Sequence, residues 1–385
     1  MSYNFDNPTE RRNTGSLKWD VSDGELPMWV ADMDFETAPA VKEAVVRVAQ
    51  RGIYGYSILP DEYFESIADF WGERYGFRPE PSWMVFSTGV VAAISSMVRK
   101  LTTPAENVLI QPPVYNIFYN SILNNGRNII TNELLYEGGE YRMDFLDLEK
   151  KLSNPQTTLM ILCNPHNPVG KIWDRETLAK IGELCKKHGV TVISDEIHCH
   201  LTTPGKSYVP FASVNEVCRD ISVSCVAASK AFNLAGLQSA CLIAENPTLR
   251  HKVWRGINTD EVGEPNVFAV DANIAAYRRG GAWLSELNQY IYENKKYAYE
   301  FIRTNIPTLR AVNSDATYLL WVDVSRYTDN SEKFARDLRE KTGLYVSDGV
   351  EYGRGGEGFI RINLATQRAN VVDGFSRLKA YVAAL

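Results

Sequence analysis

The chain has 385 residues, of which 45% are hydrophobic and 23% charged, and its formal net charge is −6. This composition is typical of a globular protein with a substantial core, and the length allows one large domain with a smaller companion. The net negative charge and the lack of a basic block exclude nucleic acids and acidic membranes as expected partners.

Targeting signals are not expected from the sequence. The first thirteen residues are polar and charged, and no run approaches the roughly 18 apolar residues of a membrane span. The six cysteines are scattered without a C-x-x-C spacing, which favours reduced, buried thiols. We therefore predict a cytoplasmic protein.

Alternating strands and helices are expected over the first part of the chain, because short β-branched runs alternate with amphipathic segments. An extended apolar piece from Leu26 passes into a helix that Thr37 and Pro39 begin. The elements expected next are a helix at 61–75, a strand at 83–87, a helix opened by 88–89, strands at 107–111, 128–131 and 159–163, a helix at 175–188, and strands at 190–194, 221–226 and 241–244. Such repeated units predict a mostly parallel α/β sheet covered on both faces.

The later part of the chain reads differently. It becomes helical beyond Asn266, and a long helix is expected at 283–303. The remaining segments predict an extended stretch at 311–324, a helix at 332–341, a strand at 359–364 and a helix at 371–382. We predict a large domain at 46–280 and a smaller α+β part made of 1–45 and 281–385.

Three polar residues, Asn167, Asp195 and Lys230, follow three of the expected strands. The carboxyl ends of parallel strands form one rim, so these residues are expected to converge. A lysine there is poorly hydrated, which lowers its pKa and leaves an amine that can attack a carbonyl. Each has a plainer interpretation as well: Lys230 as a solvated lysine at a strand end, and Asp195 as a helix cap.

These residue types match the needs of one cofactor. Pyridoxal phosphate requires a lysine imine, a carboxylate at its pyridine nitrogen, a donor near its ring oxygen and a site for its phosphate. The helix start at Thr88 and Gly89 offers backbone N–H groups and the positive end of a dipole to an anion. A single glycine after a strand also serves an ordinary turn.

Seven stretches, taken in order, carry a resemblance to a known family. They are LPMWVADMDF near the start, YGY at 54–56, PPVY at 112–115, LCNPHNPVG at 162–170, SDEIHCHL at 194–201, SKAFNLAGLQ at 229–238 and GFIRINLAT at 358–366. The chain resembles the aspartate-aminotransferase-like, fold type I pyridoxal-phosphate enzymes, and is most similar to their cystathionine β-lyase, MalY/PatB branch of C–S lyases. The resemblance implies a large domain with a mostly parallel seven-stranded sheet and a smaller α+β domain.

The resemblance also implies a role for each residue that matches a family motif. Lys230 bonds to the cofactor and later acts as acid and base, Asp195 pairs with the pyridine nitrogen, and Asn167 donates to the ring hydroxyl oxygen. Tyr115 stacks on the cofactor ring, the alternative being a core tyrosine. Arg361 holds the substrate α-carboxylate by paired hydrogen bonds, the alternative being an internal salt bridge.

The phosphate is expected against the backbone of Gly89, Val90 and Val91, with Ser229 adding a hydroxyl. Tyr56 matches a tyrosine that reaches the phosphate of the neighbouring subunit, so the resemblance implies a homodimer with shared active sites. The residues predicted to be catalytic are Lys230, Tyr115 and Tyr56.

The sequence departs from the wider aminotransferase pattern at three places. His198 stands where many relatives have a tyrosine, and it is predicted to hydrogen-bond near the ring oxygen. The pair His198 and His200 lacks further ligands, so no metal site is predicted. Ala227 and Gln238 replace a serine and an arginine common in relatives, which makes the phosphate site less cationic.

Composition and spacing do not choose between the reactions open to such a site, since removal of the α-proton is common to them. The resemblance favours a C–S lyase that carries out α,β-elimination of cystathionine, cysteine or S-substituted cysteines to thiol, pyruvate and ammonia. One alternative is an aminotransferase. Another is a non-catalytic protein that uses the cofactor fold to bind or regulate a partner.

Overall fold

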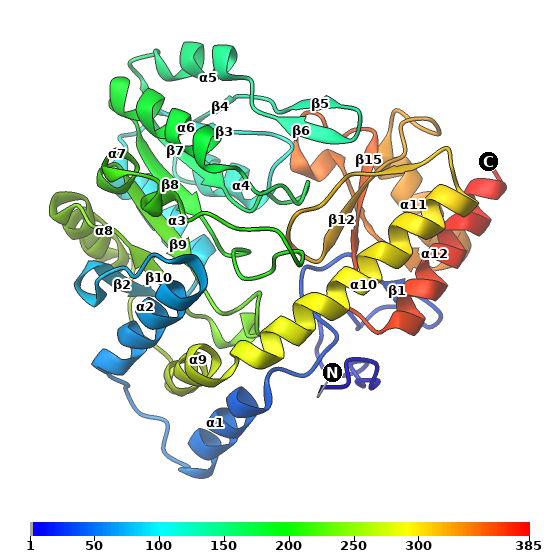
Figure 1. The fold of residues 1–385 in the computed structure, drawn as a ribbon, viewed down its shortest axis with the longest axis horizontal. Helices are drawn as coiled ribbons and strands as arrows, with labels where there is room; N and C mark the ends of the chain where they lie inside the picture. Colours follow the sequence, from blue (N-terminus) through cyan, green and yellow to red (C-terminus); the bar gives the residue numbers. More distant parts are fainter. Residues whose placement is uncertain (1–2) are drawn as a thin grey trace.

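The computed structural model describes residues 3–385 and builds them around two β-sheets joined by a long helix (Figure 1). A seven-stranded sheet lies in one half of the molecule and a four-stranded sheet in the other. Helix α10 (Gly281–Asn305) runs from the first half into the second. None of the helices within 3–385 is both long and apolar enough to cross a membrane.

The seven-stranded sheet has the strand order β2-β10-β9-β8-β7-β3-β4. Strand β10 is antiparallel to both of its neighbours, and the other strand pairs are parallel. The strands are β2 (Met84–Ser87), β3 (Asn107–Ile110), β4 (Asn128–Thr131), β7 (Thr157–Cys163), β8 (Thr191–Asp195), β9 (Ser222–Val226) and β10 (Ala240–Ile243). The predicted α/β class with a mostly parallel seven-stranded sheet is confirmed.

Both faces of this sheet are covered, as strand β7 illustrates. Leu159, Ile161 and Cys163 pack toward α3, α4 and α8, whereas Met160 and Leu162 pack toward α5, α6 and α7. Alternate residues of a strand point to opposite faces, so a strand buried on both must be apolar throughout. These helices are α3 (Val90–Leu101), α4 (Ile117–Leu123), α5 (Phe145–Leu152), α6 (Arg175–Lys187), α7 (Glu216–Asp220) and α8 (Pro247–Thr259).

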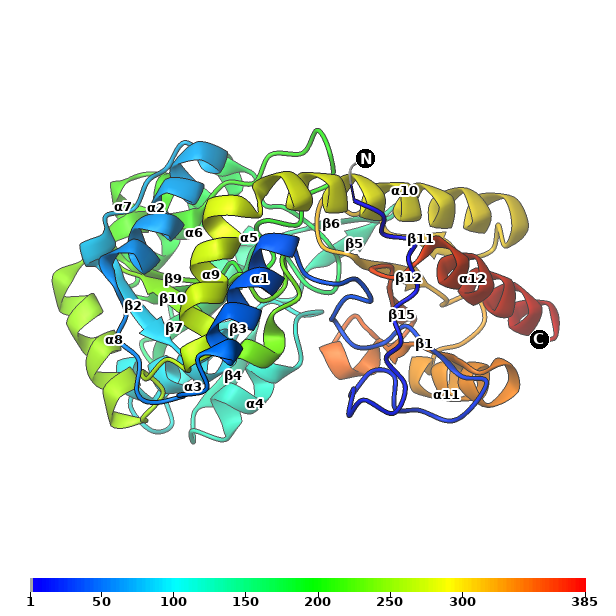
Figure 2. The ribbon, with the colours of Figure 1, turned by 90° about the horizontal axis from the view of Figure 1, so that it is seen from below.

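Three further helices pack together beside the large sheet and against the start of α10 (Figure 2). Helix α2 buries Tyr63, Ile67, Phe70 and Trp71, which recur at helical spacing. The three helices are α1 (Pro39–Gln50), α2 (Asp61–Tyr75) and α9 (Val267–Arg279). The bounds of α2 agree with the helix predicted at 61–75.

The four-stranded sheet is antiparallel, with the order β11-β12-β15-β14, and it packs against α10, α11 and α12. Strand β1 pairs in parallel with β13, which attaches the N-terminal segment to this half of the molecule. The elements are β1 (Leu26–Pro27), β11 (Arg310–Ala311), β12 (Leu319–Asp323), α11 (Ser331–Thr342), β13 (Leu344–Tyr345), β14 (Ser347–Asp348), β15 (Phe359–Asn363) and α12 (Arg368–Ala383). The division into 46–280 and 1–45 with 281–385 stays a prediction.

The remaining regular elements are short. A separate hairpin, β5 with β6, lies between β4 and α5, and four single turns of 3₁₀-helix connect other elements. They are β5 (Leu135–Glu137), β6 (Glu140–Arg142), η1 (Pro81–Trp83), η2 (Phe211–Ser213), η3 (Ala235–Leu237) and η4 (Val350–Tyr352).

Candidate active site

A cavity of about 490 Å³ lies where the carboxyl ends of β7, β8 and β9 meet β14 and β15 of the small sheet. This is the rim at which α/β sheets bind their ligands. Every residue predicted from the sequence to form the site lines this cavity, except Tyr56. Those that line it are Gly89, Val90, Val91, Tyr115, Asn167, Asp195, His198, Ser229, Lys230 and Arg361.

Lys230 lies in the turn just past the end of β9, and its Nζ donates to the carbonyl oxygen of Ala31 at 2.6 Å. The pKa of Lys230 is lowered from 10.5 to about 8, chiefly by burial and also by the charge of Arg361, against the opposing charges of Asp32 and Asp195. At a pKa of about 8, roughly a tenth of the amine is uncharged at pH 7. Lys230 is therefore not a solvated lysine at a strand end.

Asp195 ends β8 and is only 4% exposed. Its Oδ1 accepts the backbone N–H of Ile197 at 3.1 Å within a turn, so it does not cap a helix. The pKa of Asp195 is raised from 3.8 to about 7, chiefly by burial. The hydrogen bond from Ile197 and the charge of Lys230 oppose this rise, and the charge of Glu196 contributes to it. A cation placed against this carboxylate would favour its charged form, and a protonated pyridine nitrogen is such a cation.

Arg361 projects from β15 and is 5% exposed. Its Nη1 donates to Oδ1 of Asn167 at 3.2 Å, and its Nη2 donates to the carbonyl oxygen of Trp29 at 2.8 Å. Its Nε has no hydrogen-bond partner, and no carboxylate in the described chain forms an ion pair with it. The salt-bridge alternative therefore does not hold. A buried guanidinium without a counter-ion fits the binding of a carboxylate.

The start of helix α3 faces the cavity through Gly89, Val90 and Val91. No side chain caps this helix start, and a Cβ at Gly89 would meet no atom within 4 Å. Unpaired backbone N–H groups beside open space fit a phosphate. Ser229 and Gln238 also line the cavity, so Gln238 stands at the wall where relatives carry an arginine.

The two histidines of the H-x-H pair, His198 and His200, lie in different surroundings. His198 lines the cavity, and burial lowers its pKa well below 6.5, with the charges of Lys230 and Arg361 acting in the same direction. Its Nδ1 is buried and has no hydrogen-bond partner. His200 instead lies 2.6 Å from the hydroxyl of Tyr75 through its Nδ1. Within residues 3–385 no group of His, Cys, Asp and Glu side chains could hold a metal ion.

The two predicted tyrosines lie apart. Tyr115 lines the cavity with its ring edge-on to Phe118, at a centroid distance of 5.7 Å. Tyr56 is fully exposed, in a segment without regular structure that also exposes Ile53 and Ile58. The structure of one chain thus does not bring Tyr56 to its own cavity, and its role stays a prediction.

Residues 29–34, which we call the N-terminal strap, form a wall that was not singled out from the sequence. Its backbone carbonyls accept hydrogen bonds from Arg361 at Trp29, from Asn363 at Val30, and from Lys230 at Ala31. Any residue type can supply a carbonyl oxygen, so single residues gave no signal. The only available signal was the LPMWVADMDF stretch as a whole.

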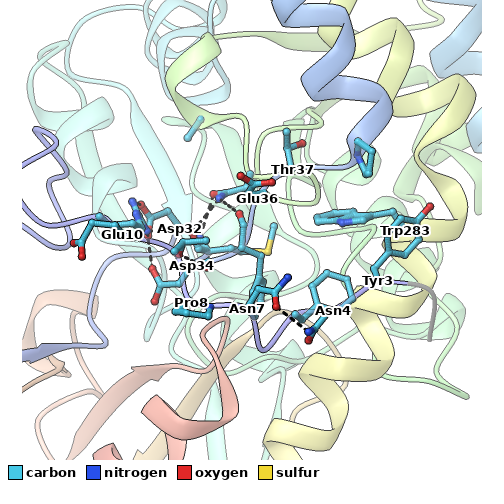
Figure 3. Close-up of a pocket in the computed structure, with 18 of the residues that line it drawn as sticks. Tyr3, Asn4, Asn7, Pro8, Glu10, Asp32, Asp34, Glu36, Thr37 and Trp283 are labelled. Carbon is cyan, nitrogen blue, oxygen red and sulfur yellow. Dashed lines mark hydrogen bonds and ion pairs between the residues drawn. The ribbon is translucent and has the colours of Figure 1, made fainter.

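A second hollow of about 1120 Å³ borders the strap and contains none of the predicted site residues (Figure 3). Its wall includes Asp32 and Asp34, and Arg11 donates to both carboxylates at 2.7 Å. Lys18, which is fully buried, pairs with Asp34 at 2.8 Å. This hollow is larger than the cavity at Lys230 but lacks its chemistry, and its ion pairs hold the strap in place.

Pyridoxal phosphate fits the smaller cavity. The buried carboxylate of Asp195 forms no ion pair, Nδ1 of His198 has no partner, and the N–H groups of α3 face open space beside Gly89. Lys230 supplies the amine that the cofactor aldehyde requires. The carboxylate, amine and anion site that the cofactor needs therefore line one cavity.

Comparison with known proteins agrees with this fit. Residues 26–377 match the family described as aminotransferase class I and II, and the chain belongs to that family. It is 44% identical over 384 residues to cystathionine beta-lyase PatB of Bacillus subtilis, covering 98% of this chain and 99% of PatB. It is 30% identical to Protein MalY of Escherichia coli, covering 98% of both chains.

Solved structures give the same result. Cystalysin from Treponema denticola, which contains a pyridoxal 5′-phosphate cofactor, superposes with a TM-score of 0.96 at 31% identity and full coverage of both chains. A PLP-bound C–S lyase from Staphylococcus hominis superposes with a TM-score of 0.93 at 34% identity, covering 99% of this chain and 98% of its own. The predictions of the family, of pyridoxal phosphate as cofactor and of a C–S lyase are confirmed.

Proposed function

We propose that this protein is a pyridoxal-phosphate-dependent C–S lyase that converts cystathionine, cysteine or S-substituted cysteines to a thiol, pyruvate and ammonia. One observation carries the proposal: Lys230, Asp195 and the unpaired Arg361 line the same cavity in a chain 44% identical to a cystathionine beta-lyase. The missing counter-ion of Arg361 supports a substrate that carries an α-carboxylate. The low pKa of Lys230 supports a base beside the bond to be broken.

The cofactor residues have separate tasks in this proposal. Pyridoxal phosphate, when bound, supplies an electron sink for the negative charge that develops at the substrate α-carbon. Asp195 would stabilise a positive charge at the ring nitrogen, and Asn167 and His198 would hold the ring oxygen. Tyr115 would pack on the ring, and the N–H groups of α3 with the hydroxyl of Ser229 would hold the phosphate.

The substrate residues position the reacting atoms. Arg361 fixes the α-carboxylate with its planar fork, which leaves the α-carbon beside the amine of Lys230. The uncharged amine of Lys230 removes the α-proton as a general base. Loss of the β-sulfur substituent as a thiol then completes the elimination, and hydrolysis of the remaining fragment yields pyruvate and ammonia.

Pyruvate release tests the reaction directly. The purified holoenzyme should release one pyruvate and one thiol from each L-cystathionine, and Lys230→Ala should lose at least about 10² to 10⁴ in rate. The variant should keep the far-ultraviolet circular dichroism and unfolding midpoint of the wild type. Near-normal turnover by the purified variant would exclude Lys230 as the base.

Transamination is the second candidate, because a PLP-bound putative aminotransferase from Clostridium difficile 630 superposes with a TM-score of 0.96 at 35% identity. The residues that remove the α-proton would be the same. The two reactions differ in their products, since a transaminase consumes a 2-oxo acid and releases no thiol. Conversion of an added 2-oxo acid to its amino acid, with neither pyruvate nor thiol released, would favour transamination.

We also propose that the active unit is a homodimer with shared sites and that it resides in the cytoplasm. Tyr56 supports the dimer, because it is fully exposed beside Ile53 and Ile58 and does not reach its own cavity. All six cysteines are buried and unpaired, in agreement with a reducing compartment. Mixing Tyr56→Phe with Lys230→Ala should restore activity on subunit exchange, since one site of each mixed dimer is intact. Verified exchange without recovery would refute the shared site.

A further inference from the structure

Glu351 is the one charged residue of the cavity wall to which the proposed function gives no task. The other charged residues there are Asp195, Lys230 and Arg361, which the cofactor and the α-carboxylate occupy. We infer that Glu351 selects substrates whose leaving thiol carries an ammonium group. This inference rests on the proposed function and adds to it the charge of the preferred leaving group.

The carboxylate of Glu351 is held in place but not neutralised. It lies on η4, and its Oε2 accepts a hydrogen bond from Nδ2 of Asn116 at 3.4 Å. Within the described chain it forms no ion pair; the nearby Arg354 instead pairs with Glu133 at 3.3 Å. Its backbone N–H donates to Oδ1 of Asp348 at 3.3 Å, so the only other charge it contacts is also negative.

Glu351 and Arg361 are both adjacent to Tyr352. The guanidinium of Arg361 lies over the ring of Tyr352, at 5.0 Å from its centroid. Glu351 precedes Tyr352 in the chain and lines the same cavity, and its charge contributes to raising the pKa of Tyr352 and of Tyr115, after burial, which is the main cause for both. The cavity wall therefore carries a cation for the α-carboxylate and an exposed carboxylate on the residue next to the tyrosine that this cation contacts.

A cysteine conjugate that binds Arg361 with its α-carboxylate extends its sulfur substituent away from Lys230, toward the mouth of the cavity. Leu17, Trp29 and Ile117 line this outer part and provide apolar contact for methylene groups. Glu351, which has no ion-pair partner among residues 3–385, then offers a carboxylate to the end of the substituent. An ammonium there gains an ion pair, whereas a neutral alkyl end gains nothing from the carboxylate. The homocysteine portion of cystathionine carries such an ammonium.

The test compares two substrates of nearly equal shape, S-(2-aminoethyl)-L-cysteine and S-propyl-L-cysteine. The wild-type holoenzyme should favour the aminoethyl compound in kcat/KM, and Glu351→Gln should reduce that preference about fivefold through KM, as expected for a partly exposed ion pair. Glu351→Lys should shift the preference toward S-(2-carboxyethyl)-L-cysteine. Glu133→Gln, which removes the same charge outside the cavity, should leave the preference unchanged.

Equal loss for both substrates in Glu351→Gln, or the same change in Glu133→Gln, would overturn the inference. A second measurement separates it from the proposed function. L-lysine and L-2-aminoheptanoic acid have the shapes of the two substrates but no leaving group, so their binding constants report the site without turnover. Wild type should favour lysine and Glu351→Gln should not, even if no substrate is cleaved. Failure to cleave S-propyl-L-cysteine would count against the lyase proposal alone.

Discussion

Replacing Arg361 with glutamine should separate binding of the substrate from stability of the fold. Its Nε is unpartnered and no carboxylate pairs with it, so the enzyme buries a charge that only a ligand neutralises. A charge-assisted pair of this kind is typically worth about 1.5–3 kcal/mol, which corresponds to a rise in KM of roughly ten- to a hundredfold. We expect that rise for substrates with an α-carboxylate.

The effect on stability should be small, because two contributions oppose each other. The variant loses the bonds from Arg361 to Asn167 and to the carbonyl of Trp29, each typically worth about 0.5–1.5 kcal/mol. It also relieves the burial of an unpaired ion, which costs several kcal/mol. The free energy of unfolding should therefore change by less than about 2 kcal/mol in urea titrations of the ligand-free protein.

Arg339→Gln provides a matched control. Arg339 lies in the same half of the molecule and pairs with both carboxylate oxygens of Glu25, at 2.7 and 2.9 Å. Removing a paired, partly exposed arginine should reduce stability modestly and leave KM unchanged. The reasoning about Arg361 is refuted if Arg361→Gln lowers the free energy of unfolding by clearly more than about 2 kcal/mol, or if its KM rises equally for amines that lack an α-carboxylate.

Two buried carboxylates, Asp195 and Asp34, give further predictions. Asp195→Asn should lower kcat by about 10² or more while the cofactor stays bound, measured by turnover and visible absorbance. In the cofactor-free protein the pKa of Asp195 is raised to about 7 from 3.8, so the folded state binds more protons than the unfolded state between these pH values. The free energy of unfolding should therefore fall as pH rises from about 4 to 7, and it should fall less in Asp195→Asn. Asp34→Asn removes the shorter ion pair of the buried Lys18 and leaves only its contact with Asp32 at 3.7 Å, which should cost up to about 3–5 kcal/mol in urea unfolding. Glu36→Gln, which breaks an exposed pair with Lys42, should cost less than about 1 kcal/mol.

Much of the fold was predictable because its strands and helices have strong periodicity. Helix α2 and strand β4 were both predicted with their observed bounds, because the spacing of their apolar residues indicates one type of element. Helix α8 (Pro247–Thr259) was missed, although Asn246 caps it and Pro247 begins it. The antiparallel direction of β10 was not predictable, because the connections before and after a strand set its direction. The pattern of apolar residues is the same for a strand in either direction.

Part of the site was likewise predictable from the sequence and part was not. Lys230, Asp195 and Asn167 were found because their side-chain chemistry is specific and each follows an expected strand. Arg361 was assigned only through the resemblance of the GFIRINLAT stretch to a family motif. The carbonyls of the N-terminal strap were not found, because backbone atoms carry no residue signature. Glu351 was not found either, since an acidic residue in a loop is ordinarily a solvated one. The role of Tyr56 stays a prediction, because this exposed residue does not line the cavity of its own chain.

The strap explains how one cavity can depend on three distant parts of the sequence. Lys230 follows a strand of the large sheet and Arg361 lies on the small sheet, yet both donate to carbonyls of residues 29–31. The strap itself continues from β1, which pairs with β13, and its Asp34 end is fixed by Lys18. The N-terminal segment therefore links the amine and the guanidinium through adjacent backbone carbonyls. Because hydrogen bonds to fixed carbonyls restrict both side chains, the strap holds Lys230 and Arg361 in one cavity without contributing a reactive side chain.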